Sequence, residues 1–559
     1  MQRPDIVLLV LDTQRVDRLA CCGFPVETSP YLDAFAAEAT IFSHAISPAQ
    51  WTVPSHASMF TGLYPSQHTV FQVNSLLPEN LATLAERLQQ GGYFTAGFSN
   101  NPLIGSLNNG LQRGFDSLLN YGGLLSKQPG WANMHSDLAS KRRQGFNHRL
   151  SKLSSRIQNT LANSNAANKL RVSPVILPLW RMGLKLKGNL KGDTPQTLSD
   201  ASQLLIERYG TEPGQPVFIF INLMGVHAPY NPPHWAVKQF APRLNNRAGR
   251  VFLRRLNAIR ANNIDFISLV KTDAPCASPG QVVERPLLSA SNHAARAFLR
   301  RVGVIRDGSI DKWLGQDGLD DKYNAMLQDL YNAEVAAQDV QIGLFLHRLW
   351  KTGALDRTLF IIVSDHGEHL GEKQMIGHNF GVHEELIHVP LLIRDPSGCL
   401  PRGATMSPFV STRRVFHTAL TAAGVATSPE EALSLTYANS NDPDQDVVFA
   451  EAEPLQTVMR LMEKRRPGLT QELGYDLPYR AVYHDEYKLI AHNQDQVKLY
   501  NVRDDPTENV DLGQVLPEKV KALRKHLHRL AQHTPGASIS QLENDPLLRQ
   551  RLKALGYLE

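Results

Sequence analysis

The chain has 559 residues, of which 42% are hydrophobic and 20% are charged, and its formal net charge is +5. This composition is that of an ordinary globular protein and excludes a largely disordered chain. A net charge this small predicts no nucleic-acid partner, because that inference requires clustered basic residues. The four cysteines lack the spacing of a disulfide scaffold or of a cysteine metal site.

The N-terminal apolar run at 6–11 is too short for the core of a signal peptide and no small-residue cleavage site follows it. No apolar stretch of the sequence reaches the length of a membrane span. We therefore expect a protein located in the cytoplasm.

Three short apolar runs, at 6–11, 217–221 and 359–363, are predicted to be buried strands. Helical patterns alternate with them at 31–39, 80–90 and 323–349. This alternation indicates an α/β fold with a doubly wound, mixed but mainly parallel sheet. Two segments, at about 120–200 and 245–311, interrupt the pattern and are interpreted as insertions.

The first insertion contains a basic stretch at 126–193, in which apolar residues stand beside cations. One interpretation is a peripheral contact with a membrane or another anionic surface. The other, which we favour, is a solvated basic face.

A stretch rich in Ser, Asn, Asp and Pro lies between 428 and 446. Short alternating strands follow between 479 and 500, and a helix is expected at 517–532. These features predict a main domain at 1–430 and a small C-terminal α+β domain at 431–559.

Polar side chains follow each predicted strand. Asp12 ends the first strand, His227 comes shortly after the second, and Asp365 and His366 end the third. Ligands of open α/β sheets bind just past the carboxyl ends of the strands. We therefore expect these clusters to converge on one site.

Thr52 precedes a predicted helix that contains Pro54 in its first turn. It is either a simple helix cap or an alcohol nucleophile that faces an oxyanion at the helix N-terminus. A threonine hydroxyl needs a base or a metal to become a nucleophile. Asp12, Asp365 and His366, with Thr52 as a further ligand, would hold one divalent ion: zinc or manganese, which imidazole favours, or calcium or magnesium.

Histidines near these residues are candidates for contacts with the substrate. His227 could protonate a leaving group or bind an oxyanion oxygen. His378 and, next in order, His383 lie in loops from which they can reach the site, and a second metal near them is left open. His388 precedes an apolar run at 389–393 and is expected to pack in the core.

The motifs T-V-P-S-H-A-S-M-F-T-G at 52–62, H-A-P-Y at 227–230 and S-D-H-G-E at 364–368 together resemble the sulfatase family of the alkaline phosphatase superfamily. H-E-E-L-I-H-V-P-L-L-I at 383–393 and L-Y-N-V-R-D-D-P-T-E-N at 499–509 extend the match. The resemblance implies an ester hydrolase with an anionic substrate and a metal held by Asp12, Asp365 and His366. It implies anion binding by His227 and His378, and it places Asn100 where many relatives have a substrate-contacting lysine. His56 and His383 complete the predicted substrate-binding set.

The sequence departs from this family at two positions. True sulfatases have the motif C-x-P-x-R at the position of Thr52, and the cysteine (in some, a serine) of that motif is oxidised to formylglycine. Thr52 cannot form that aldehyde. Thr13 stands where many relatives have a second aspartate. A sulfated threonine cannot release sulfate by collapse to an aldehyde, but a phosphorylated threonine can be cleaved by in-line attack at phosphorus. Thr52 therefore moves the expectation toward phosphate esters or diesters.

Three functions follow as hypotheses. The first is a metal-dependent hydrolase of sulfuric or phosphoric esters. The second is a phospho-group transferase with a threonine nucleophile, although relatives that modify lipids usually have membrane spans. The third is a binding protein that has kept the metal site and lost turnover. The natural substrate, the identity of the metal and the oligomeric state do not follow from the sequence.

Overall fold

The computed structural model describes residues 3–122, 191–209, 214–246 with 249, 321–436, 442–465, 467–492 and 496–531. The predicted basic segment at 126–193 and the insertion at 245–311 lie outside these residues except at their edges. Within the described part of the chain, no helix is both long enough and apolar enough to cross a membrane.

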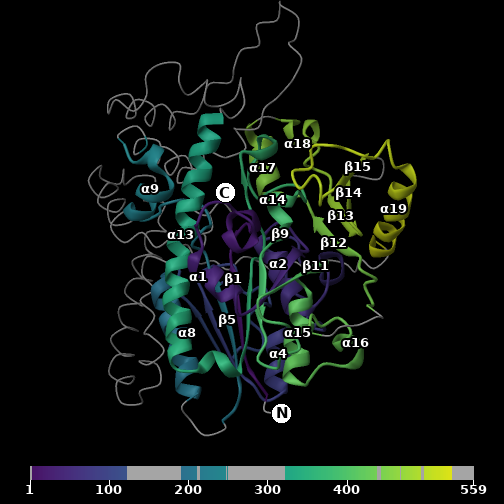
Figure 1. Cartoon of the computed structure of the whole chain (residues 1–559). Coiled ribbons are helices and arrows are strands. Elements are labelled where there is room, and N and C mark those ends of the chain that lie inside the picture. Colours follow the sequence, from purple (N-terminus) through teal and green to yellow (C-terminus); the bar gives the residue numbers. More distant parts are fainter. Residues whose placement is uncertain are drawn as a thin grey trace, which may run out of the picture.

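The centre of the fold is a nine-stranded sheet whose middle strands run parallel, which confirms the predicted fold class (Figure 1). In spatial order its strands are β11 (Ala404–Ser411), β2 (Thr40–Ile46), β10 (Leu391–Arg394), β6 (Thr358–Val363), β1 (Asp5–Leu11), β5 (Val217–Leu223), β3 (Phe94–Ser99) and β4 (Ser117–Asn120). The short strand β9 (His388–Val389) pairs with β2. β10 is antiparallel to both β6 and β2, so the sheet is mixed.

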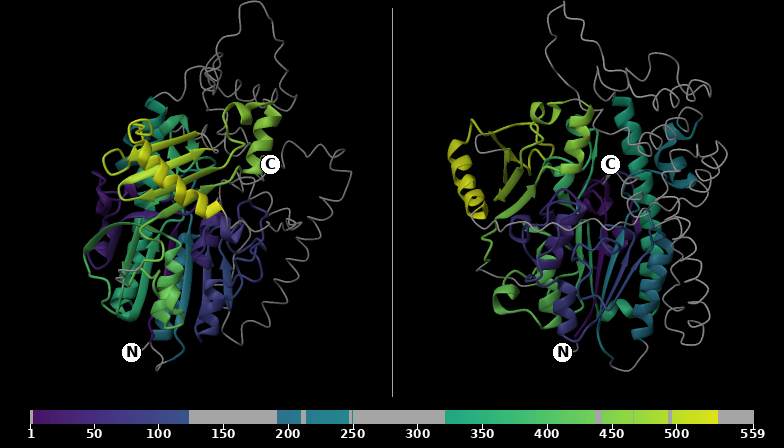
Figure 2. Two further views of the ribbon diagram at one scale, coloured as in Figure 1. Left: turned by 90° about the vertical axis from the view of Figure 1, so that its right-hand side faces the viewer. Right: turned by 180° about the vertical axis from the view of Figure 1, so that it is seen from behind.

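Both faces of this sheet are covered by helices, as Figures 1 and 2 show. Side chains of β1 alternate between the two layers, with Leu8 in one core cluster and Leu9 in the other. One layer contains α2 (Thr52–Thr61), α4 (Leu84–Gln90) and α15 (Arg414–Ala423), and the other contains α1 (Pro30–Ala36), α8 (Thr194–Tyr209) and α13 (Asp321–Lys351). Burial on both faces explains why the strands are continuous apolar runs rather than alternating ones.

The predicted strands at 6–11, 217–221 and 359–363 are β1, β5 and β6. The helix expected at 80–90 begins only at Leu84, because Thr83 and Glu86 form a capping box there. Thr83 Oγ1 accepts from the Glu86 amide at 3.1 Å, and the Glu86 carboxylate accepts from the Thr83 amide at 2.8 Å. The capping box therefore sets the N-terminus of α4. The apolar periodicity alone placed that N-terminus too early.

The remaining short elements connect these layers. They are η1 (Val16–Arg18), η2 (Ala20–Cys22), α3 (Pro65–His68), α9 (His234–Phe240), η4 (Pro242–Leu244), η6 (Ala354–Arg357), β7 (His369–Leu370), η7 (Glu372–Gln374), β8 (Ile376–Gly377), α14 (Glu384–Ile387), α16 (Ser428–Glu431), α17 (Gln456–Arg465) and α18 (Leu469–Glu472).

A second, antiparallel sheet follows, in the order β12 (Val448–Ala452), β13 (Tyr479–His484), β14 (Tyr487–His492) and β15 (Gln496–Asn501). Helix α19 (Pro517–Ala531) packs on one face of this sheet, and residues of β2 and α14 pack on the other. The sheet therefore lies beside the main one and shares a core cluster with it (Figure 2).

A buried ion cluster joins the second sheet to helix α14. Lys488 of β14 is fully buried, and its Nζ lies 2.8 Å from Glu384 of α14 and 2.6 Å from Glu508. The Tyr483 hydroxyl also donates to Glu384. An ammonium group buried this deeply requires both carboxylates, since unpaired buried charge is strongly unfavourable.

We predict that Lys488→Met lowers the free energy of unfolding by about 3–5 kcal/mol, because it removes the fully buried ammonium group that the carboxylates of Glu384 and Glu508 share. Urea unfolding monitored by circular dichroism measures this loss. The control is Lys519→Met, which removes a largely exposed ion pair with Asp485 (3.0 Å) and should cost less than about 1 kcal/mol. Equal losses in the two variants would contradict a structural role for the buried cluster.

Candidate active site

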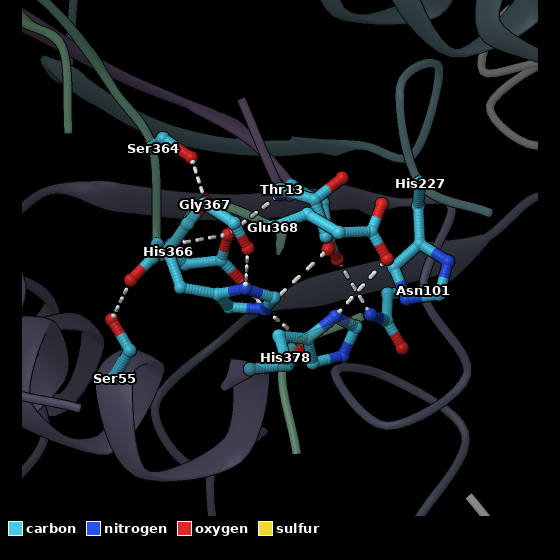
Figure 3. A network of polar contacts seen from close by, with 12 residues as sticks. Thr13, Ser55, Asn101, His227, Ser364, His366, Gly367, Glu368 and His378 are labelled. Atoms are coloured by element: carbon cyan, nitrogen blue, oxygen red, sulfur yellow. Dashed lines mark hydrogen bonds and ion pairs between the residues drawn. The ribbon is translucent and has the colours of Figure 1, made fainter. Parts of the chain in front are cut away.

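The polar side chains that follow the central strands meet at one edge of the main sheet. β1, β5 and β6 are parallel neighbours in register, so the residues after them lie side by side. Asp12 follows β1, and Asp365 and His366 follow β6. Asn101 comes two residues after the end of β3, the next parallel strand beyond β5. Figure 3 shows a network of polar contacts that includes His366 and Asn101.

Asp12, Asp365 and His366 form a buried group with the dimensions of a metal site. One ligand atom from each residue lies within 4.8 Å of the other two. His366 Nε2 is 3.9 Å from Asp12 Oδ1 and 3.6 Å from Asp365 Oδ2, and all three side chains are fully buried. Neither of these carboxylate oxygens has a hydrogen-bond partner among the described residues. Two buried, unsatisfied carboxylate oxygens beside an imidazole fit a divalent cation.

The electrostatics of this group are those of an uncompensated anionic site. Burial raises the pKa of Asp12 to about 6. Burial, and then the neighbouring charge of Asp12, raise the pKa of Asp365 well above its ordinary value. Burial holds the pKa of His366 well below its ordinary range, so this imidazole is neutral and suited to metal ligation. A cation between the two carboxylates would offset both of the causes that disfavour their charge.

The surrounding hydrogen bonds orient these ligands. His366 Nδ1 is 2.9 Å from the Gly367 carbonyl, which can only accept, so the proton is on Nδ1 and the Nε2 lone pair faces the two carboxylates. Asn101 Nδ2 donates to Asp12 Oδ2 at 2.7 Å, and the Thr13 amide donates to Asp365 Oδ1 at 3.2 Å. Each carboxylate therefore has one oxygen held in place and the other directed at the centre of the group.

Thr52 is the first residue of α2 and is fully buried. We predicted it to lie just before the helix, but Trp51 is the N-cap residue, and the helix therefore begins one residue earlier than expected. Thr52 Oγ1 is 3.3 Å from His366 Nε2. The helix start is tied to β6 through Ser55, whose hydroxyl donates to the Asp365 carbonyl at 2.7 Å. This link fixes the Thr52 hydroxyl beside the metal-ligand candidates.

His56 supports the site from inside the core. Its Nδ1 donates to the Thr52 carbonyl at 2.9 Å, and its Nε2 lies 3.3 Å from Asn222 Nδ2, which donates to it. Burial lowers the pKa of His56 to about 4, consistent with a neutral ring held on both sides. His56 Nδ1 is 3.5 Å from Asp365 Oδ2. Both ring nitrogens thus contact protein atoms, while the predicted contact of His56 with substrate stays a prediction.

His227 and His378 lie beside the metal-ligand group (Figure 3). Their ring centroids are 5.3 Å apart, and the His378 ring is 4.4 Å from that of His366. His227 Nδ1 is 2.6 Å from the Ala228 carbonyl, so it donates there and directs Nε2 elsewhere. The structure therefore brings these two histidines together with the predicted metal ligands.

Two other predicted substrate-binding residues make different contacts. Thr197 Oγ1 donates to Asn100 Oδ1 at 2.7 Å, and Asn100 Nδ2 donates to Thr194 at 3.2 Å, so this amide faces α8. His383 Nδ1 lies 3.2 Å from His369 Nε2. These contacts leave the assignment of both residues to substrate binding as a prediction.

Sequence reasoning did not single out three further residues at this site: Asn101, Glu368 and Tyr230. Asn101 holds Asp12, as described above. Glu368 is buried, its Oε1 lies 3.5 Å from His378 Nδ1, and its Oε2 accepts from the Tyr230 hydroxyl. All three lie in motifs that follow strand ends, so position along the chain was an available signal. Their contacts depend on side-chain packing between distant segments.

Comparison with known proteins agrees with this geometry. The model of the family described as Sulfatase matches residues 4–425. The ulvan-active sulfatase of Formosa agariphila is 36% identical over 94 residues, which cover 17% of this chain and 18% of that protein. The alignments span less than half the length of the curated relatives that the chain matches.

Solved structures resemble the chain over nearly its full length. The phosphonate monoester hydrolase of Agrobacterium radiobacter has a TM-score of 0.59 at 19% identity, over 96% of this chain and 100% of that one. The phosphonate monoester hydrolase of Silicibacter pomeroyi has a TM-score of 0.56 at 18% identity, over 97% and 100%. At such identities the likeness shows a common fold.

We predict that Asp365→Asn weakens the binding of divalent metal at least about tenfold, because it removes a charged ligand from the group. Titration calorimetry with Mn²⁺, together with elemental analysis of the purified protein, measures this change. The matched control is Asp339→Asn, which alters a buried carboxylate that instead accepts from the amides of Tyr31 and Leu32 at the start of α1. Unchanged metal affinity in Asp365→Asn would remove this residue from the site.

Proposed function

The chain belongs to the sulfatase family, and we propose that it is a metal-dependent hydrolase of sulfuric or phosphoric esters with Thr52 as its nucleophile. The observation that carries the proposal is the 3.3 Å contact between Thr52 Oγ1 and His366 Nε2, at the edge of a buried Asp-Asp-His group. A hydroxyl placed only as a helix cap would have no need of this neighbour. A divalent ion bound by Asp12, Asp365 and His366 would promote ionisation of Thr52 and offset negative charge on the ester.

Residues of the chain supply the nucleophile, the proton for the leaving group and the binding site for the anionic group. Thr52 Oγ1 loses its proton to solvent, forms a bond to the central atom of the ester and displaces the alcohol, so the ester group is transferred to the threonine. His227, whose Nδ1 is held by the Ala228 carbonyl, presents Nε2 to protonate the departing oxygen and then recovers a proton from solvent. The N-terminal amides of α2 and the positive end of its dipole favour the anionic group that Thr52 would carry.

Phosphorus esters are the preferred substrate class within this proposal. The methyl group on the Thr52 Cβ excludes the aldehyde through which formylglycine enzymes release sulfate. A threonyl phosphate ester, in contrast, can be hydrolysed by in-line attack of water at phosphorus. The two phosphonate monoester hydrolases share only the fold with this chain, and they add phosphonate monoesters to the phosphate diesters as candidates.

The metal itself stays open between manganese, magnesium, calcium and zinc. The imidazole ligand favours zinc or manganese, and the two carboxylates also admit magnesium and calcium. Thr13, at the position where relatives have a second aspartate, has a buried hydroxyl without a hydrogen-bond partner among the described residues. One carboxylate fewer makes the site less negative, which disfavours calcium relative to the transition metals.

We predict that Thr52→Ala abolishes turnover with folding intact, because the variant lacks the nucleophile, whereas Thr52→Ser keeps activity. The assay is hydrolysis of 4-nitrophenyl sulfate, 4-nitrophenyl phosphate, 4-nitrophenyl phenylphosphonate and bis(4-nitrophenyl) phosphate with each of the four metals. Thr61→Ala is the matched control, since it removes the hydroxyl of the last residue of the same helix, where that group bonds the Ala57 carbonyl and the Leu63 amide.

Diester or phosphonate turnover that is lost in Thr52→Ala supports the proposal. Sulfate turnover lost in the same variant supports the hydrolase but reverses the preferred substrate class. Formation of a new phosphodiester when glycerol is added as acceptor indicates the transferase. Metal binding without turnover of any substrate indicates the binding protein.

A further inference from the structure

Hydrolysis of a threonyl ester requires a group that accepts a proton from the attacking water. Once Thr52 carries the phosphoryl group, water must attack phosphorus, and the proton of that water needs an acceptor. A threonine enzyme thus requires a general base in its second half-reaction. The candidates among the described residues are the imidazoles next to Thr52.

The contacts of each imidazole indicate which histidine can act as the general base. His366 presents Nε2 to the metal-ligand group, and the two nitrogens of His56 are engaged by the Thr52 carbonyl and Asn222. His227 and His378 are left as neighbours, with ring centroids 5.3 Å apart. His227 Nδ1 contacts a neutral carbonyl, whereas His378 Nδ1 faces a carboxylate, Glu368 Oε1, at 3.5 Å. A carboxylate behind an imidazole stabilises the positive ring that forms when the ring accepts a proton.

Glu368 is built into the protein as a fixed group. Its side chain is 2% exposed, and its second oxygen accepts from the Tyr230 hydroxyl, which comes from the segment after β5. Arg15 Nη1 donates to the Glu368 backbone carbonyl at 3.0 Å. Tyr230 is itself fully buried and packs edge-on against Tyr331, with ring centroids 6.0 Å apart. Contacts from separate segments therefore hold this carboxylate in one orientation.

The pair of Glu368 and His378 lies close to Thr52, the proposed nucleophile. The His378 ring lies 4.4 Å from the His366 ring, and His366 Nε2 lies 3.3 Å from Thr52 Oγ1. His378 Nδ1 makes no hydrogen bond among the described residues, so it can pair with Glu368 when the ring takes up a proton, and Nε2 would then be the nitrogen that contacts water. The 3.5 Å separation is longer than a strong hydrogen bond, as is common for catalytic contacts in proteins without substrate.

We propose that Glu368, anchored by Tyr230, positions His378 as the base that activates water for hydrolysis of the threonyl ester; this rests on the proposed role of Thr52. Water oxygen forms the new bond to phosphorus while its proton goes to His378 Nε2. The bond between phosphorus and Thr52 Oγ1 breaks, and the electron pair stays on that oxygen. The proton then returns from His378 to Thr52, which restores both groups and releases the phosphorus acid. His378 is a catalytic residue in this step, and Glu368 and Tyr230 are positioning residues.

The test separates the two half-reactions by rapid mixing of the full-length protein with Mn²⁺ and bis(4-nitrophenyl) phosphate. Formation of the threonyl ester releases one nitrophenolate per site in a burst, and its hydrolysis sets the later steady rate. We expect Glu368→Gln and His378→Ala to lower the steady rate on the order of 10²-fold, and we expect the burst rate of Glu368→Gln to stay within about threefold of the parent protein. Mass spectrometry of quenched samples should then find the nitrophenylphosphoryl group accumulated on Thr52.

Two further variants sharpen this result. Tyr230→Phe should change the same ratio in the same direction but by less, because it only loosens Glu368. Glu385→Gln is the matched control, since it changes another buried glutamate, which pairs instead with Lys373 at 2.9 Å, and it should leave the ratio unchanged. Metal content should be unaltered in all four variants, since none of them removes a proposed ligand.

The inference is overturned if Glu368→Gln slows the burst and the steady rate by the same factor, or if no adduct accumulates on Thr52. That result would leave the proposed function intact as long as Thr52→Ala is inactive. Retained turnover in Thr52→Ala would instead remove the threonyl ester, and with it both the proposed function and this inference.

Discussion

Two buried carboxylates, Asp12 and Asp365, stand side by side at the carboxyl edge of the main sheet, and the rest of the site depends on how their charge is held. Parallel pairing of β1 with β6 forces this proximity, because residues just past neighbouring parallel strands share one edge. Burial raises the pKa of both groups, so the arrangement is unfavourable unless a cation offsets it. The fixed Nδ1 proton of His366 completes a donor set that suits such an ion.

The fold was largely predictable because its strands are buried on both faces. Continuous apolar runs such as Ile6–Leu11 have few structural alternatives, and the polar residues that end them mark the edge where a site forms. The start of α4 was not predictable from periodicity, because a capping box at Thr83 overrides it. The signals that located the strands are short runs of neighbouring apolar residues, so the sequence alone was enough to place them.

The site was predictable in part, and the limit follows from the range of its interactions. Asp12, Asp365, His366 and Thr52 were predicted to converge, and the structure places them together. The pairing of Glu368 with His378 joins side chains on either side of a short hairpin, and Tyr230 comes from a segment more than 130 residues away. Contacts of this kind depend on rotamers and on packing between segments, which motif spacing does not encode. The hydrogen bond from Asn101 to Asp12 was not predicted for the same reason.

Thr52 connects the metal group to the remaining chemistry. True sulfatases have an aldehyde hydrate where this chain has the alcohol of Thr52, so in the proposed mechanism the second half-reaction proceeds at phosphorus with an activated water. The proposed pairing of the buried Glu368 with His378 would meet that requirement. The departure at position 52 and the carboxylate behind His378 would then be two parts of one mechanism.

A crystal structure with Mn²⁺ and orthovanadate bound would show whether Thr52 is the nucleophile at a metal site, since vanadate adopts the geometry of a phosphoryl group under attack. We expect vanadium in bonding contact with Thr52 Oγ1 and an anomalous manganese peak between Asp12, Asp365 and His366. Vanadate bound away from Thr52, or manganese bound by other residues, would contradict it.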